Sequence, residues 1–135
     1  MVSVFPQLLA FSLLAPFILR IAVGVAFIAL GAKHFGRSVP SMRAELAQIF
    51  PWAGSFALLL GVAEVALGIL LLAGLWTQIA AIVAGVGALK LAYFKHRFSF
   101  TIVTPFSIGT YILLAVISFS LLLTGAGFFA LDLPL

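Results

Sequence analysis

The 135-residue sequence contains no cysteine and very few charged residues. Without cysteine the chain forms no disulfide and carries no thiolate metal site or CxxC redox pair of its own. Only 7% of its residues are charged and 65% are hydrophobic, whereas average soluble domains have about 25% and about 45–50%. A single domain of this size leaves much of its surface exposed, so it cannot hide that many apolar side chains from water. The composition excludes a soluble enzyme and predicts an integral membrane protein.

Acidic residues are the scarcest charges, with three Asp/Glu against seven Lys/Arg and a formal net charge of +4. The basic residues lie at the ends of hydrophobic stretches, where they indicate membrane orientation and phospholipid contact rather than nucleic-acid binding. Residues 1–19 contain no basic residue. The charged n-region of a secretory signal peptide is therefore missing, and no such peptide is expected.

Four hydrophobic stretches indicate four membrane spans, at about residues 8–31, 53–75, 78–94 and 105–124. Crossing about 30 Å of hydrocarbon takes roughly 20 apolar residues in a helix, so the third span is short and Lys90 near its end is expected to snorkel to the interface. The runs lack the alternation of membrane strands. The sequence predicts an all-α, four-helix integral membrane bundle that forms one domain over residues 1–135.

The connection at residues 32–52 is long and polar enough to hold a short amphipathic helix, with Ser41 as its cap and Pro51 at its end. The apolar face would hold Met42, Leu46, Ile49 and Phe50, and the polar face Arg43, Glu45 and Gln48. Such a helix would lie on the membrane surface or be tucked under the bundle. An ordinary structured loop is the alternative, and the pattern favours neither.

The distribution of basic residues predicts the orientation. The first long loop holds Lys33, Arg37 and Arg43, and the second holds Lys95 and Arg97, whereas both tails and the turn at Trp76 hold none. Because cytoplasmic loops carry an excess of Lys and Arg, we expect both long loops in the cytoplasm and both termini outside. The expected location is the cell membrane of a bacterium or archaeon, with the lipid bilayer as the first partner.

Arg20 and Glu64 are the charges expected deepest in the membrane, since each lies near the middle of its span. An unpaired charge at the bilayer centre costs at least about 2.5–3.5 kcal/mol. We therefore expect the two side chains to form a buried ion pair within roughly 4 Å. Two interpretations stay open: a purely structural link between the first two spans, or a polar lining for a ligand or proton path.

Small residues form a stripe on each of these two spans, on the same helical faces as Arg20 and Glu64. The stripes consist of Gly24 and Gly31 in the first span and of Gly54, Gly61 and Gly68 in the second. Small residues mark the places where membrane helices pack closely. The pattern predicts that the first two spans touch along these glycines and that both charges face the interior of the bundle.

Two histidines lie within basic clusters at span ends on the same side of the membrane. The clusters are Lys33 with His34, and Lys95 with His96 and Arg97. Contacts with headgroup phosphates are one interpretation, contact with a quinone headgroup a second, and haem ligation a third. No spacing motif for a metal site is present, and no resident metal or cofactor is expected apart from a quinone.

The residues resemble the DoxX family over nearly the whole chain. The first span reads LRIAVGVAF and then GAK at 31–33, where the family has an arginine, a glycine, an aromatic residue, and then a glycine and a lysine. Glu64 followed by GILLLAGL at 68–75, and the ending GAGFFALD at 125–132, are similar as well. Arg20, Lys33 and Glu64 match polar positions of the family.

The resemblance implies a four-helix membrane bundle in a family that includes the DoxD-type subunit of thiosulfate:quinone oxidoreductase. It favours a membrane subunit or anchor of a larger redox or quinone-linked complex, with protein partners and no redox centre of its own. The alternatives are a quinone-interacting oxidoreductase subunit and, from another class, a small transporter or lipid-binding protein. Whether the chain itself is an enzyme stays open, with a non-catalytic subunit favoured.

Overall fold

A computed structural model describes residues 12–127 and 130–131. This part of the chain is all-helical, as predicted. The elements in order are α1 (Leu14–Ala32), α2 (Val39–Ala47), the 3-10 helix η2 (Ala53–Phe56), α3 (Ala57–Ala73), α4 (Thr77–Phe98) and α5 (Ile108–Thr124). Residues 8–11, with which the first predicted span begins, lie outside the described residues.

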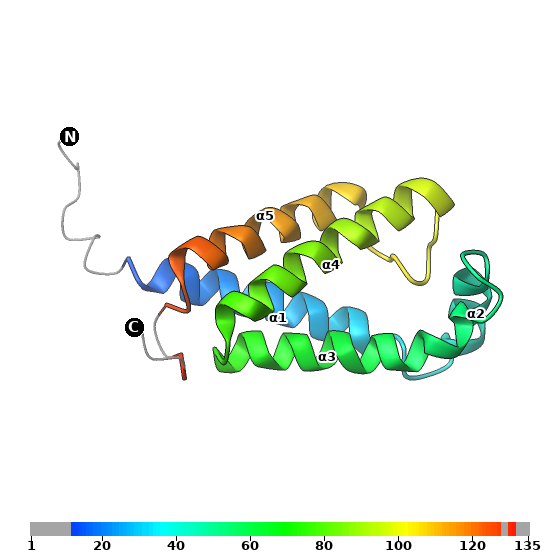
Figure 1. Cartoon of the computed structure of the whole chain (residues 1–135), viewed down its shortest axis with the longest axis horizontal. Helices are drawn as coiled ribbons and strands as arrows, with labels where there is room; N and C mark the ends of the chain where they lie inside the picture. The colour runs from blue at the N-terminus through cyan, green and yellow to red at the C-terminus, as the bar shows by residue number, and fades with distance from the viewer. Residues whose placement is uncertain (1–11, 128–129, 132–135) are drawn as a thin grey trace.

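The four long helices form a bundle of two helix pairs, with α1 beside α3 and α4 beside α5 (Figure 1). The segment 53–73 and helices α1 and α4 are long and apolar enough to cross a membrane, and α5 is a shorter apolar helix of 17 residues. A tight turn joins α3 to α4, in which Gly74 and Trp76 both adopt left-handed backbone angles. The predicted all-α membrane bundle is confirmed.

Helix α4 is longer than the third predicted span. It runs for 22 residues to Phe98, through Lys95, His96 and Arg97, and Ser99 caps its end with a φ of 52°. Basic side chains in the last helical turn interact favourably with the negative end of the helix dipole, so the cluster that was expected to terminate the span extends the helix instead. Lys90 consequently lies about two turns before the end of α4.

Helices α1 and α3 are in close contact at two glycine pairs. A Cβ added to Gly68 would lie 2.6 Å from the Gly24 carbonyl oxygen, and one added to Gly31 would lie 2.7 Å from the Gly61 carbonyl oxygen. Both distances are far shorter than real Cβ contacts, so a larger residue would force the backbones apart. The remaining stripe residue, Gly54, lies in η2 and packs against the backbone of α2 rather than against α1.

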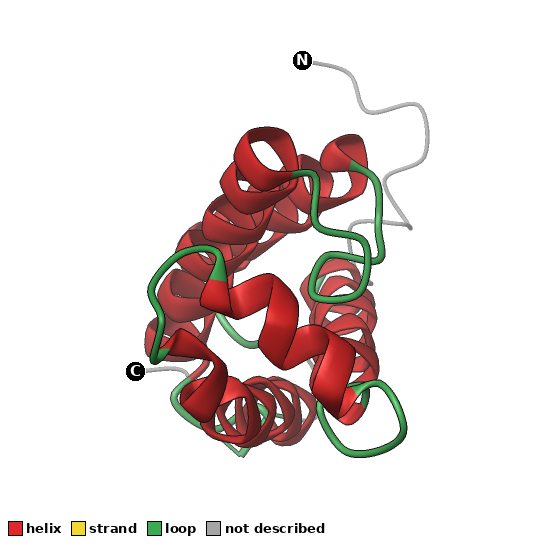
Figure 2. Cartoon of the chain, turned by 90° about the vertical axis from the view of Figure 1, so that its right-hand side faces the viewer, coloured by secondary structure: helices red, strands yellow, loops and turns green. Residues whose placement is uncertain are grey.

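Helix α2 crosses one end of the bundle (Figure 2). Met42 and Leu46 are buried in a small second core with Phe100 and Val103 from the α4–α5 loop, so the helix is tucked under the bundle. The expectation that Ser41 caps this helix is wrong, because the helix already begins at Val39. Pro40 lies in the first turn, where its missing N–H has no hydrogen bond to make.

Candidate functional site

Arg20 lies at the end of the bundle opposite α2, where it joins three segments. The residue is fully buried, and its Nη1 donates a hydrogen bond of 2.7 Å to the carbonyl oxygen of Ala126, which follows α5. The same nitrogen packs directly against Gly74 in the turn after α3, and the guanidinium carbon lies 5.5 Å from the centre of the Phe17 ring. The side chain therefore ties α1 to the turn after α3 and to the C-terminal segment.

The predicted ion pair between Arg20 and Glu64 is not formed. Because Gly24 faces Gly68 and Gly31 faces Gly61, the antiparallel register places Arg20 opposite Leu72. Leu72 is two helical turns, or about 12 Å, further along α3 than Glu64. The expectation of equal depth took the first helix to begin near residue 8, but α1 begins at Leu14, so Arg20 lies in its second turn and not at its middle.

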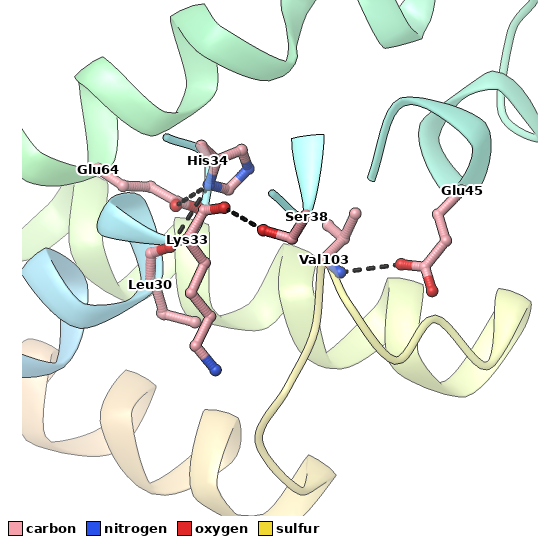
Figure 3. A network of polar contacts seen from close by, with 7 residues as sticks. All are labelled: Leu30, Lys33, His34, Ser38, Glu45, Glu64 and Val103. Carbon is pink, nitrogen blue, oxygen red and sulfur yellow. Dashed lines mark hydrogen bonds and ion pairs between the residues drawn. The ribbon is translucent and has the colours of Figure 1, made fainter. Parts of the chain in front are cut away.

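Glu64 pairs instead with His34, which follows the end of α1. Nδ1 of His34 lies 3.4 Å from Oε2 of Glu64 and also 3.4 Å from the Leu30 carbonyl oxygen (Figure 3). The histidine is 2% exposed, and its Cβ occupies the space that a side chain at Gly61 would need. The gap that Gly61 leaves in α3 therefore admits the imidazole to the interior of the bundle.

The surroundings of His34 favour its neutral form. Burial lowers the pKa of His34 below its usual 6.5, and the positive charge of nearby Lys90 acts in the same direction. Hydrogen bonds with the backbone of Leu30 and Gly31 oppose this shift without reversing it. Near neutral pH the ring is uncharged, so it lies beside Glu64 as a neutral group rather than as a fixed cation.

A groove between α3 and α4 reaches Glu64 from the outside of the bundle. Its volume is about 130 Å³, close to that of the roughly 150 Å³ engineered cavity that holds one benzene ring. The walls are apolar except for the Glu64 carboxylate and the Lys90 side chain. The lining residues are Phe27, Leu60, Ala63, Glu64, Leu67, Val83, Gly87, Lys90 and Leu91. A flat ring with one or two polar atoms fits this size and polarity.

The remaining predicted contact residues do not gather around that groove. Lys33 is exposed, and its Nζ lies 5.9 Å from the centre of the Phe106 ring. His96 and Arg97 are exposed near the end of α4, in an environment unlike that of buried His34. Contact of these residues with headgroup phosphates, a quinone or haem stays a prediction.

Lys95 has a structural role in the loop that follows α4. Its Nζ donates hydrogen bonds to the carbonyl oxygens of Phe100, at 2.8 Å, and Thr104, at 3.0 Å. These bonds use two of the three protons of the ammonium group. They hold the 100–104 segment against the end of the helix, close to where α2 docks.

Glu45 is a residue whose role the sequence analysis missed. Its carboxylate accepts the N–H groups of Thr101 at 2.9 Å, Ile102 at 3.1 Å and Val103 at 2.8 Å, together with the Thr101 hydroxyl at 3.1 Å. Figure 3 shows the bond from Val103. Burial acts to raise the pKa of Glu45, but these donors outweigh it and hold the pKa below its usual 4.5. The bond pattern fastens α2 to the α4–α5 loop. All but one of its donors are backbone N–H groups, so the residue types in the sequence did not signal this role.

Comparison with known proteins identifies one family. The DoxX family model matches residues 15–97, which is more than half of the chain. The matched region extends from α1 into the last turn of α4 and includes Arg20, His34, Glu64 and Lys90. No curated protein and no solved structure matches the chain significantly.

Proposed function

Since the chain belongs to the DoxX family, we propose that this small membrane protein is a subunit of a larger redox complex in which the α3–α4 groove accommodates a quinone headgroup. The observation that carries the proposal is a ring-sized groove, with one carboxylate and one ammonium in an otherwise apolar wall, between two helical segments that are long and apolar enough to cross a membrane. A quinone is a flat, lipid-soluble ring with two carbonyl oxygens, and it would reach this groove from the bilayer.

In this proposal the electrons come from a partner protein. The chain has no cysteine and therefore no thiol pair to cycle between oxidised and reduced forms. Its contribution would be to hold the ring at a fixed place relative to the redox centre of the partner. We accordingly assign it the role of a membrane subunit rather than that of the electron donor.

Filling the groove tests the quinone assignment. A Cβ at Gly87 would lie 3.7 Å from the Phe27 ring, an ordinary contact, so the substitution Gly87→Leu projects a side chain into the groove without displacing backbone. We expect the parent protein in lipid nanodiscs to bind decylubiquinone and Gly87→Leu to bind it at least about tenfold more weakly. Gly109→Leu is the matched control, since only the Ser107 hydroxyl lies within 4 Å of that position.

Purification under mild conditions tests the partner assignment. Affinity purification of the protein in gentle detergent, followed by mass spectrometry, should recover a redox protein in stoichiometric amount. The subunit role would be contradicted by two results together: the protein is recovered without any partner, and the Gly87→Leu variant nevertheless lowers quinone reduction in the same membranes.

We also propose that the α2 end of the bundle faces the cytoplasm. Exposed basic residues gather there, with Lys33, Arg37 and Arg43 around α2 and Arg97 at the end of α4, as expected for cytoplasmic loops. A reporter inserted near Ser38 should be cytoplasmic, and one fused after Leu135 should be extracytoplasmic. A cytoplasmic C-terminus would contradict this orientation.

A further inference from the structure

His34 is a buried titratable residue that the proposed quinone groove leaves without a role. Its Nε2 has no hydrogen-bond partner among the residues that the structure describes, and the residue is 98% buried, given its exposure of 2%. A buried polar atom left in this state normally costs about 1–3 kcal/mol. A buried Nε2 without a partner, in a ring that lies beside the Glu64 carboxylate, points to a role for His34 other than stability.

The two nitrogens of the imidazole face different groups. Nδ1 lies 3.4 Å from both Oε2 of Glu64 and the Leu30 carbonyl oxygen, and Nε2 points away from Glu64 (Figure 3). A carbonyl oxygen only accepts hydrogen bonds, so Nδ1 carries the hydrogen and, in the neutral ring, Nε2 is the basic nitrogen. The ring can therefore accept a proton on Nε2 while Nδ1–H gives one to Glu64.

Resting on the proposed quinone-linked function, we propose that His34 and Glu64 form a proton relay that leads from the α2 end of the bundle to a ring bound in the α3–α4 groove. His34 follows the end of α1, beside the loop that leads to α2, whereas the Glu64 carboxylate lines the groove itself. The relay thus connects the loop end of the molecule to a site that lies deeper in the membrane.

Reduction of a quinone to the quinol takes two electrons, which the partner protein supplies, and two protons. The carboxyl group of Glu64 gives its proton to the carbonyl oxygen that faces it, and a new O–H bond forms there. As Nε2 of His34 takes up a proton that enters from water at the α2 end, Nδ1–H reprotonates Glu64. A flip of the ring then returns the remaining N–H to the side of Leu30 and Glu64. The other quinone oxygen takes its proton from water at the side of the groove where Lys90 is exposed.

Other titratable groups surround the relay on the neighbouring helices. Lys90 from α4 is close enough to act on both His34 and Glu64, and Tyr111 from α5 is close enough to feel the charge of Glu64. The Lys90 ammonium provides an alternative, more exposed source of protons for the groove. Any test of the relay must therefore distinguish delivery through His34 from direct delivery along the Lys90 side.

The test measures proton uptake when a quinone binds. Protein in nanodiscs, at mildly alkaline pH with a pH-indicator dye and little buffer, is mixed with decylubiquinone in a stopped-flow instrument. Glu64 must become protonated to donate a hydrogen bond to the quinone oxygen, so the parent should take up a proton on binding, and its affinity should rise by up to about tenfold per unit fall in pH. Glu64→Gln should bind the ring without proton uptake or this pH dependence.

The histidine variants then separate the relay from a structural role. In His34→Gln the final amount of proton uptake should be retained but its rate should fall about a hundredfold. The exposed His96, near the same end of the bundle, provides the matched control His96→Gln, which should behave as the parent. Glu64→Asp keeps the carboxyl group but withdraws it from His34, so it should slow proton uptake in the same way. This variant replaces His34→Gln in the test if His34→Gln does not fold.

The possible results distinguish failure of the relay from failure of the proposed function. If the parent binds quinone and His34→Gln or Glu64→Asp takes up protons as fast as the parent, protons reach Glu64 directly and the relay is wrong while the quinone groove stands. Quinone binding without any proton uptake in the parent would overturn the relay as well. If the parent does not bind quinone at all, both the relay and the proposed function fall.

Discussion

Arg20 and Glu64 are both ionisable residues within apolar helices, but the two ends of the bundle treat them differently. Arg20 is fully buried and donates to a backbone carbonyl in a short, well-formed hydrogen bond. Glu64 is 17% exposed, lines a groove and has the neutral imidazole of His34 at 3.4 Å. One end is closed around its charge, and the other leaves its charge accessible.

The difference shows what each charge contributes. A guanidinium that is enclosed by helix, turn and C-terminal segment contributes to holding these segments together, because its bonds are made inside the folded chain. A carboxylate that is held loosely beside a groove contributes little to stability but remains available to a ligand. We therefore interpret the Arg20 end as structural and the Glu64 end as functional.

The largest effect should come from removing the Arg20 side chain. Arg20→Leu deletes a charged donor and leaves the Ala126 carbonyl oxygen without it, so the free energy of unfolding should fall by roughly 3 kcal/mol. Thermal unfolding in detergent micelles would measure this loss. Arg37→Leu, at an exposed position in the loop before α2, is the control. If Arg20→Leu is as stable as Arg37→Leu, Arg20 does not stabilise its end of the bundle.

The glycine contacts between α1 and α3 should give the next largest effect. Gly31→Ala places a Cβ 2.7 Å from the Gly61 carbonyl oxygen, and the resulting shift of the helices should cost about 1–3 kcal/mol. Gly109→Ala is the control, since the Cβ there would make only an ordinary contact of 3.8 Å with the Ser107 hydroxyl and alanine favours the helix by about 1 kcal/mol. Equal stability of the two variants would show that α1 and α3 do not approach as closely as described.

Glu45 should give a smaller effect that depends on pH. Its pKa lies below the usual 4.5 in the folded protein, so its carboxylate stabilises the docked loop above that pH, and the contribution is lost as the pH falls through the lowered pKa. Near neutral pH, Glu45→Gln should expose the amides of Thr101, Ile102 and Val103 to hydrogen exchange about tenfold more than in the parent. At pH values well below 4.5 the two proteins should exchange alike. A difference that persisted there would mean that the charge of Glu45 is not what holds the loop.

The smallest expected quantity is the coupling between Arg20 and Glu64. Because the two residues lie about 12 Å apart along the helices, a double-mutant cycle with Arg20→Leu and Glu64→Leu should give an interaction free energy below about 0.5 kcal/mol. The ion pair that the sequence suggested would instead make the double variant recover much of the loss. Stability measurements on the parent, the two single variants and the double variant decide between these outcomes.

The helices and the contact between α1 and α3 could be predicted from the sequence because both leave a periodic pattern of residues. Hydrophobic runs indicated the helices, and the seven-residue spacing of the glycines indicated where α1 and α3 meet, because a helix presents residues at that spacing on one face. The register of the contact was also available in principle. Pairing Gly24 with Gly68 and Gly31 with Gly61 already places Arg20 beyond the reach of Glu64.

The partners of the charged residues could not be predicted in this way. Arg20 bonds the backbone of Ala126, and Glu45 bonds the backbone N–H groups of the 101–103 segment. Every residue offers such groups, so the residue types give no indication of which are used. The sequence placed His34 with Lys33 in a basic cluster at the end of a span, where it could contact headgroups, a quinone or haem. In the structure the absence of a side chain at Gly61 lets it turn inward. That contact is visible only once α1 and α3 are aligned.

The hydrogen bond from Arg20 to Ala126 also has a consequence for biogenesis. The two residues are 106 positions apart in the chain, and ribosomes add about 5–20 residues per second. The arginine is therefore synthesised roughly 5–20 s before its acceptor. During that interval the guanidinium depends on water, lipid headgroups or the insertion machinery, and the bundle acquires its closed end only when translation of the last segment is complete.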